Sequence, residues 1–337
     1  MLDKMMEFTK FVAKFKFDGY AIGTAPHEVI FRQNKSCVRY FEPAERKGEP
    51  LFISMPLINK WAVFDLLPHK SVIRGLVDAG IPVYLLDWGT PQAEDAPVGM
   101  EELLDSVMRR ALDRTRRHAR NRWNTETLDA LGYCVGGTVL AAYCGLYPDS
   151  FRRVALLAAP IDFRHAGRLA TWADPETFPV DQIIDNHGNF PAELMGTSFV
   201  WLKPSTTPDK WKGLWERFDQ PGFQDTWAAI EAWNSDSIDF WGEAYRSYIK
   251  NCYFQNMYFQ DGWPIGGRKA DLRKVMSPLH VFAADRDHIC PPAAAFGAKD
   301  VWGGPVQCTE LKGGHVGICL SSRLVKAIAA WSLEPEA

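Results

Sequence analysis

No excess of charge of either sign marks this sequence. Its 38 Lys and Arg residues nearly balance 41 Asp and Glu residues, which gives a formal net charge of −3 at pH 7. Nucleic-acid-binding surfaces need a clustered basic excess, so we expect no nucleic-acid partner. Apolar runs long enough to span a membrane are also missing, and the first residues lack the layout of a signal peptide. We therefore expect a cytoplasmic protein with no transmembrane segment.

Paired cysteines are missing as well. The seven cysteines are odd in number and scattered, and no two of them form a C-x-x-C pair. This pattern indicates neither a disulfide framework nor a zinc site, so we expect a reducing compartment, no metal and no cofactor. The sequence does have 47% hydrophobic and 23% charged residues, which is typical of a globular enzyme with a full core.

The most informative stretch is residues 128–140, which reads as a short apolar strand, a glycine-rich turn and a helix. Cys134 lies at the turn, with Gly132 two residues before it and Gly136 two residues after it. This is the spacing of the nucleophile elbow of α/β-hydrolases, with cysteine in place of serine. Such a turn places the side chain at a helix N-terminus and leaves the N–H of Val135 free to bind an oxyanion. Alternatively, Cys134 is one more small buried residue, as free cysteines often are.

Buried strands alternate with helices on both sides of this turn. Near-continuous apolar runs predict strands of a parallel sheet covered on both faces. These runs are residues 51–55, 83–88, 154–159, 278–284 and 306–311, and a two-stranded lead-in is predicted over residues 28–41. The loop after the run at 51–55 is either an ordinary turn or the source of a second oxyanion donor, for which the N–H of Ile58 is the candidate.

An acid and a histidine follow the last two predicted strands. Asp285 and Asp287 come after the strand at 278–284, and His315 lies between glycines after the strand at 306–311. Nucleophile, acid and histidine in this chain order, each at the carboxyl end of a strand, are typical of the α/β-hydrolase triad.

Residues 162–272 interrupt the alternation of strands and helices. The segment is rich in proline and tryptophan and has helical pieces but no strand series. We interpret it as a cap whose aromatic residues line an apolar cavity, or alternatively fill the cap's own core. The predicted organisation is a helix and lead-in strands at 1–50, a first core part at 51–161, the cap at 162–272 and a second core part at 273–337.

Two predicted helices carry basic surfaces. The helix over residues 1–20 has an apolar face of Met5, Phe8, Val12 and Phe15 among lysines. It either lies on an apolar or anionic surface or packs on its own domain or a partner subunit. The helix over residues 100–123 has an arginine-rich second half, which is either a solvated face or a phosphate-binding patch.

These motifs together resemble those of polyhydroxyalkanoate synthases, the cysteine-dependent polymerases of bacterial storage polyesters. The resemblance extends from Gly23 to Trp331. It is carried by residues 56–60, 83–89, 132–138, 201–204, 265–268, 287–289 and 314–315. It implies that Cys134 is the nucleophile, His315 its base and Asp287 the third member, with Asp285 the weaker candidate. It also implies oxyanion donors at Val135 and Ile58, and a histidine beside the active site and the substrate path at His288.

The same resemblance implies a substrate and partners. The substrate is an (R)-3-hydroxyacyl-CoA, which is polymerised through a Cys-linked acyl-enzyme with release of CoA. The short length and the Ile-Gly-Gly-Arg block at 265–268 are similar to the two-subunit (class III) synthases, which need a second subunit. The Cys-Val-Gly-Gly-Thr box at 134–138 is more similar to the single-subunit class. A homodimer or hetero-oligomer on the polyester granule surface is expected.

Two other functions fit the same residues. A thioesterase or an intracellular polyester depolymerase would use the same triad but admit water to the acyl-enzyme. A protein that only coats polyester granules would not need the triad, and its function would survive the change Cys134→Ala.

Overall fold

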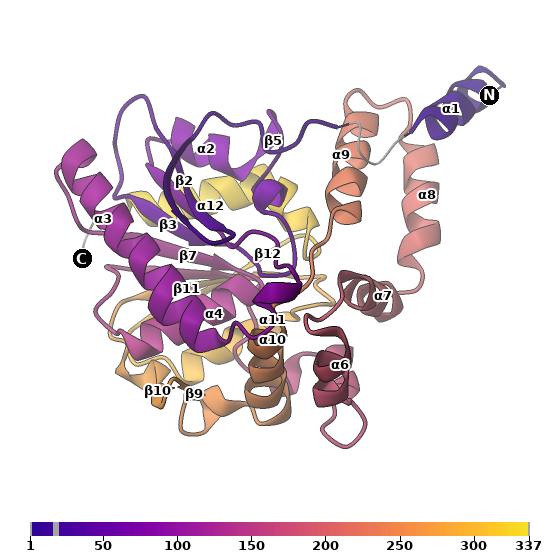
Figure 1. Ribbon diagram of the computed structural model, residues 1–337. Coiled ribbons are helices and arrows are strands. Elements are labelled where there is room, and N and C mark those ends of the chain that lie inside the picture. Colours follow the sequence, from indigo (N-terminus) through magenta and orange to yellow (C-terminus); the bar gives the residue numbers. More distant parts are fainter. Residues whose placement is uncertain (1, 16–19, 336–337) are drawn as a thin grey trace.

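An eight-stranded sheet forms the centre of the protein in the computed structural model, which describes residues 2–15 and 20–335 (Figure 1). Its strand order is β1-β2-β6-β3-β7-β8-β11-β12. The strands are β1 (Glu28–Gln33), β2 (Ser36–Phe41), β3 (Leu51–Ser54), β6 (Val83–Asp87), β7 (Asp129–Tyr133), β8 (Val154–Leu157), β11 (Leu279–Ala284) and β12 (Val306–Leu311). Strands β1, β2 and β6 pair antiparallel, and all neighbours from β6 to β12 pair parallel. The predicted, mostly parallel α/β sheet is thus confirmed.

Helices cover both faces of this sheet. Figure 1 shows α2 (Val72–Asp78) and α12 (Ser322–Leu333) on one side and α3 (Arg109–Trp123) and α4 (Val135–Leu146) on the other. Because both faces are covered, every residue of β3, β7 and β8 is buried, as their apolar sequences require. Close packing needs glycine at Gly75 of α2, where a Cβ would lie 2.4 Å from a methyl group of Val325 on α12.

The helix predicted over residues 100–123 has two parts. Glu102–Met108 is a stretch of π-helix that leads directly into α3. Several arginines of α3 contact other parts of the protein. Arg114 donates to the Ile30 carbonyl and Arg116 to the Ser150 carbonyl, while Arg122 pairs with Glu42. These contacts favour the interpretation of a structural, partly solvated face.

The segment between β8 and β11 is largely helical. Its helices are α5 (Arg168–Trp172), α6 (Val180–His187), α7 (Ala192–Leu202), α8 (Thr206–Glu216), α9 (Phe223–Ser235) and α10 (Gly242–Tyr248), which continues as π-helix over Ile249–Phe254. A hairpin of β9 (Trp263–Ile265) and β10 (Arg268–Ala270) then packs on α4, where a Cβ on Gly145 would lie 2.7 Å from the Ala270 backbone. The hairpin at the end of this segment thus packs on a helix of the core. Two short elements, β4 (Asp65–Leu67) and β5 (Lys70–Ser71), form a separate hairpin, and α11 (Pro292–Phe296) follows β11.

Helix α1 (Leu2–Lys14) lies beside α8, away from the sheet (Figure 1). Phe8 and Phe11 contact Phe218, and Phe15 contacts Trp227 of α9 at 5.2 Å between ring centroids. The predicted apolar face is therefore only partly correct, because Met5 and Val12 are exposed. Residues 1 and 16–19 of the predicted helix lie outside the described residues.

Candidate active site

The turn between β7 and α4 holds Cys134 in a strained backbone conformation. Its φ of 55° and ψ of −135° lie outside the regions that L-residues normally adopt. Only glycines fit around it. A Cβ at Gly132 would lie 2.4 Å from the Gly137 Cα, and one at Gly136 would lie 2.2 Å from the Met55 carbonyl oxygen. The glycines therefore allow the strand, the helix and the loop after β3 to meet at the cysteine.

Two backbone N–H groups near this turn have no acceptor within residues 2–15 and 20–335. They are Val135 N–H, at the first position of α4, and Ile58 N–H, in the loop after β3. The loop is itself attached to the cap. The Ile58 carbonyl accepts from Ile238 N at 3.4 Å, and the Lys60 carbonyl accepts from the Trp233 indole at 2.8 Å. Unpaired N–H groups of this kind, one of them at a helix N-terminus, are the donors from which oxyanion holes are built.

The histidine and one carboxylate form a buried pair. His315 Nδ1 lies 2.6 Å from Asp287 Oδ2, while Asp287 Oδ1 accepts from the N–H groups of Ile289 and Cys290 at 2.8 and 2.9 Å. The carboxylate is thus fixed from both sides and is positioned to hold the imidazole in the tautomer with a proton on Nδ1. Tyr133, next to Cys134, donates from its hydroxyl to the His315 carbonyl and stacks on the ring at 5.4 Å.

The free ring nitrogen of His315 faces the cysteine. Burial alone would lower the pKa of His315, but the charges of Cys134 and Asp287 and the hydrogen bond to Asp287 raise it well above its usual value. The Nε2 atom makes no hydrogen bond of good geometry to any described residue, although the pKa of the ring responds to Cys134. Cys134 therefore lies close enough to the ring to raise its pKa.

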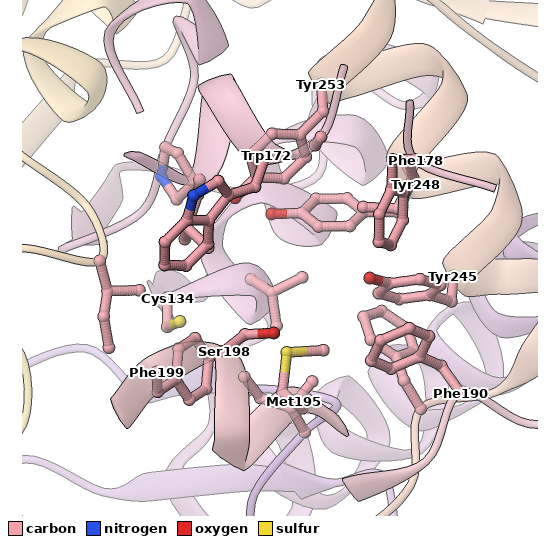
Figure 2. Close-up of a pocket in the computed structure, with 18 residues that line it drawn as sticks. Cys134, Trp172, Phe178, Phe190, Met195, Ser198, Phe199, Tyr245, Tyr248 and Tyr253 are labelled. Atoms are coloured by element: carbon pink, nitrogen blue, oxygen red, sulfur yellow. The ribbon is translucent and has the colours of Figure 1, made fainter. Parts of the chain in front are cut away.

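Two cavities meet at the cysteine. One has a volume of about 100 Å³ and is lined largely by aromatic and other apolar side chains of the cap (Figure 2). The other has a volume of about 400 Å³, is lined in part by His315, and has polar groups on its wall, including Asn59, Lys210 and Asn234. The residues that line both cavities are Ile58, Cys134, Met195, Phe199 and Ile289. Cys134 is thus reachable from two sides, one apolar and one mixed.

Residues 64–315 match the family model described as the alpha/beta hydrolase fold. A poly(3-hydroxyalkanoate) polymerase subunit PhaC from Allochromatium vinosum is 31% identical over 92% of this chain and 88% of the relative. The chain therefore belongs to the PhaC family. A second PhaC subunit, from Haloferax mediterranei, is 31% identical over 93% of this chain, which spans only 65% of that relative. A third, from Synechocystis sp., is 28% identical over 94% of this chain and 86% of the relative.

Solved structures show the same fold. The thioesterase domain from the curacin biosynthetic pathway has a TM-score of 0.53 at 13% identity, covering 92% of this PhaC chain and all of that domain. A monoacylglycerol lipase from Paleococcus ferrophilus has a TM-score of 0.51 at 14% identity, covering 89% of this chain and 99% of the lipase. The predicted α/β-hydrolase fold is therefore confirmed.

Two residues that the sequence offered for the active site, Asp285 and His288, lie apart from the two cavities that meet at Cys134. Asp285 accepts from Gly313 N at 2.8 Å, so its carboxylate holds the loop before His315 and does not contact the ring. His288 is exposed and lines a separate surface hollow with Arg168 and Lys203. Asp287 and His288 are neighbours, but the turn directs the first inward and the second outward.

Sequence reasoning missed three tyrosines in the aromatic cavity. Tyr245, Tyr248 and Tyr253 line its wall, whereas Trp172 is the one tryptophan of the cap among the residues that line it. Their spacing puts Tyr245 and Tyr248 on one face of α10, and that periodicity is the signal that could have found them.

Residues 2–15 and 20–335 contain no group of three His, Cys, Asp or Glu residues arranged to hold a metal ion. Within the same ranges, no helix combines the length and apolar character needed to cross a bilayer.

Proposed function

We propose that this chain is a polyhydroxyalkanoate synthase that polymerises (R)-3-hydroxyacyl-CoA through an acyl group carried on Cys134. The observation that carries the proposal is the arrangement of Cys134 at a strained strand–helix turn, beside a histidine held by a buried carboxylate. Membership of a family of polymerase subunits supports the reaction type.

In the acylation step, His315 Nε2 takes the thiol proton of Cys134. The sulfur attacks the thioester carbonyl, and the N–H groups of Val135 and Ile58 bind the oxyanion that forms. The new C–S bond to Cys134 replaces the C–S bond to CoA, and His315 returns its proton to the departing CoA sulfur. One thioester is exchanged for another, so the step is nearly isoenergetic.

In the elongation step, the 3-hydroxyl of one unit attacks the thioester of another. A C–O bond forms, the bond to the Cys134 sulfur breaks, and the hydroxyl proton is taken by a base and returned to the sulfur. We assign the base role to His315. Asp287 is less suited, because one of its oxygens accepts two backbone N–H groups and the other faces His315 Nδ1.

The two cavities give the two parts of the substrate different surroundings. The aromatic cavity suits the acyl and polyester part, because its wall is mostly apolar. The mixed cavity suits the polar arm of CoA, since it carries amide and charged groups. Walls of this kind exclude water from the acyl-enzyme, which favours transfer to a hydroxyl over hydrolysis. The proposed reaction uses only protein groups and the acyl-CoA itself.

Purified protein and 3-hydroxybutyryl-CoA test the proposal directly. We expect CoA release together with insoluble polymer, and neither from the Cys134→Ala variant. CoA release with free 3-hydroxybutyrate and no polymer would contradict synthesis and favour a thioesterase or depolymerase. Normal function in Cys134→Ala would favour a non-catalytic coat protein.

The proposal extends to a second polypeptide, since relatives are named subunits of a polymerase. We propose that the active form is a homodimer or hetero-oligomer that associates with its polyester in the cytoplasm. The exposed apolar side chains of α1 and α7 support a contact surface on these two helices. They are Leu2, Met5, Met6, Val200 and Trp201. Co-purification from the native host, followed by size-exclusion chromatography, measures this. A monomer that is fully active alone would contradict it.

A further inference from the structure

Tyrosine hydroxyls in the interior of this protein normally have a fixed partner. Tyr133 donates to the His315 carbonyl at 3.1 Å, and Tyr258 donates to the Thr138 carbonyl at 2.8 Å. This is the usual state of a buried hydroxyl, because leaving it without a partner costs free energy.

The tyrosines of the aromatic cavity differ. Within the part of the chain that the structure describes, the hydroxyls of Tyr248 and Tyr253 hydrogen-bond to each other, and no group outside the trio holds the hydroxyl of any of the three. Figure 2 shows the oxygens of Tyr245 and Tyr248 directed into the open centre of the cavity. The same space contains the Cys134 sulfur. Each hydroxyl therefore keeps hydrogen-bonding capacity that a ligand can use.

Packing against neighbouring aromatic side chains fixes the rings of Tyr248 and Tyr253. Tyr248 and Tyr253 meet edge to face at 5.6 Å between centroids, and both pack edge-on against Phe163, at 5.7 and 4.8 Å. Phe163 is itself buried. The positions of the two hydroxyls are thus set before a ligand arrives, which lowers the entropy that binding has to overcome.

Tyr248 and Tyr253 are also the two that lie near the nucleophile. Burial raises the pKa of both phenols, and the charge of Cys134 raises each further. Burial also raises the pKa of Tyr245, but only Tyr253 adds to it there and Cys134 does not. At neutral pH all three phenols keep their protons and can donate hydrogen bonds.

We propose that the hydroxyls of Tyr248 and Tyr253 form a binding subsite for the secondary 3-hydroxyl of the acyl group carried on Cys134. The inference rests on the proposed function and deepens it. A hydroxyl buried against the otherwise apolar wall would lose its hydration without replacement. A phenol pair can both donate to it and accept from it. The pair would therefore select 3-hydroxyacyl groups over plain acyl groups and hold the hydroxyl that elongation uses.

Two substrates that differ only in this hydroxyl provide the test. Single-turnover CoA release is measured with 3-hydroxybutyryl-CoA and with butyryl-CoA, and the ratio of the two rates is compared between variants. We expect the wild type to favour the hydroxylated substrate. Tyr248→Phe and Tyr253→Phe should each lower the ratio by about tenfold, because a hydrogen bond to the substrate is lost. The rate with 3-hydroxybutyryl-CoA should fall more than the rate with butyryl-CoA, because butyryl-CoA has no hydroxyl to bond to the pair.

Tyr245→Phe is the matched control. It removes the same atom from the same cavity, farther from Cys134, and should leave the ratio at its wild-type value. An unchanged ratio in both Tyr248→Phe and Tyr253→Phe, or an equal fall in Tyr245→Phe, overturns the subsite. Because CoA release is measured, a wild type that forms free acid instead of polymer would refute polymerisation and still leave this comparison readable.

Discussion

The change Asp287→Asn tests the catalytic pair with a nearly isosteric side chain. In the wild type, Oδ1 accepts two backbone N–H groups and Oδ2 faces His315 Nδ1. An asparagine oxygen would keep the two backbone donors, because an amide NH₂ cannot accept them. Its NH₂ group would then point at Nδ1. The imidazole would be forced to carry its proton on Nε2, the atom that must accept the proton of Cys134.

The size of the effect follows from this reversed tautomer. A serine protease with the corresponding Asp→Asn change loses about 10⁴-fold in kcat for the same reason. We expect CoA release from 3-hydroxybutyryl-CoA to fall by about 10³- to 10⁴-fold in Asp287→Asn. The neutral amide also removes a charge that raises the pKa of His315. The imidazolium then loses its proton at lower pH. Because the ring must be deprotonated to accept the thiol proton, the acid limb of the residual pH–rate profile should shift to lower pH.

Asp285→Asn is the control for this experiment. It alters only the carboxylate that accepts from Gly313 N, so CoA release should stay within a few-fold of wild type. Stopped release assays between pH 5 and 10, with circular dichroism to verify folding, measure both variants. Near-native turnover of Asp287→Asn, or an equal loss in Asp285→Asn, would refute the assignment of Asp287 as the acid of the triad.

Three further changes have defined outcomes. Cys134→Ala should abolish CoA release without changing the melting temperature by more than a few degrees, and Cys134→Ser should retain only a trace; turnover near native in either variant would be inconsistent with a sulfur nucleophile. Gly136→Ala should lower the free energy of unfolding by about 1–3 kcal/mol, because its Cβ would lie 2.2 Å from the Met55 carbonyl oxygen. Urea titrations measure this, and an unchanged unfolding midpoint would contradict that contact. Trp233→Phe removes the indole donor to the Lys60 carbonyl, so it should lower the free energy of unfolding by about 1 kcal/mol and also lower kcat. A change in KM alone would argue against a role of Trp233 in placing the oxyanion donor.

The core of the fold could be predicted because its signals are local. The apolar runs identify the strands, and the glycines around Cys134 reflect steric conditions that act within a few residues. The rule that parallel strands end at one edge of a sheet then brings Asp287 and His315 together, although 28 positions separate them. Which of these residues act in catalysis stays a prediction until variants are measured.

The cavity walls could not be predicted, because they depend on how the cap helices turn toward the core. Tyr248 faces the cavity because α10 packs with one particular face toward Phe163. Trp201 is equally aromatic and lies exposed on α7. The π-helical stretch at 102–108 could not be predicted either, since its sequence fits an ordinary helix equally well.

The cap also connects the N-terminal helix to the oxyanion loop. Phe15 packs on Trp227 near the start of α9. Trp233, near the end of the same helix, donates to the carbonyl of Lys60, two residues after the proposed donor Ile58. A loop of this kind has few backbone partners of its own, so its position depends on the helix above it. Packing of α1 stabilises α9, and α9 in turn fixes the loop whose N–H must meet the developing charge. The active site is therefore built from the cap as much as from the sheet.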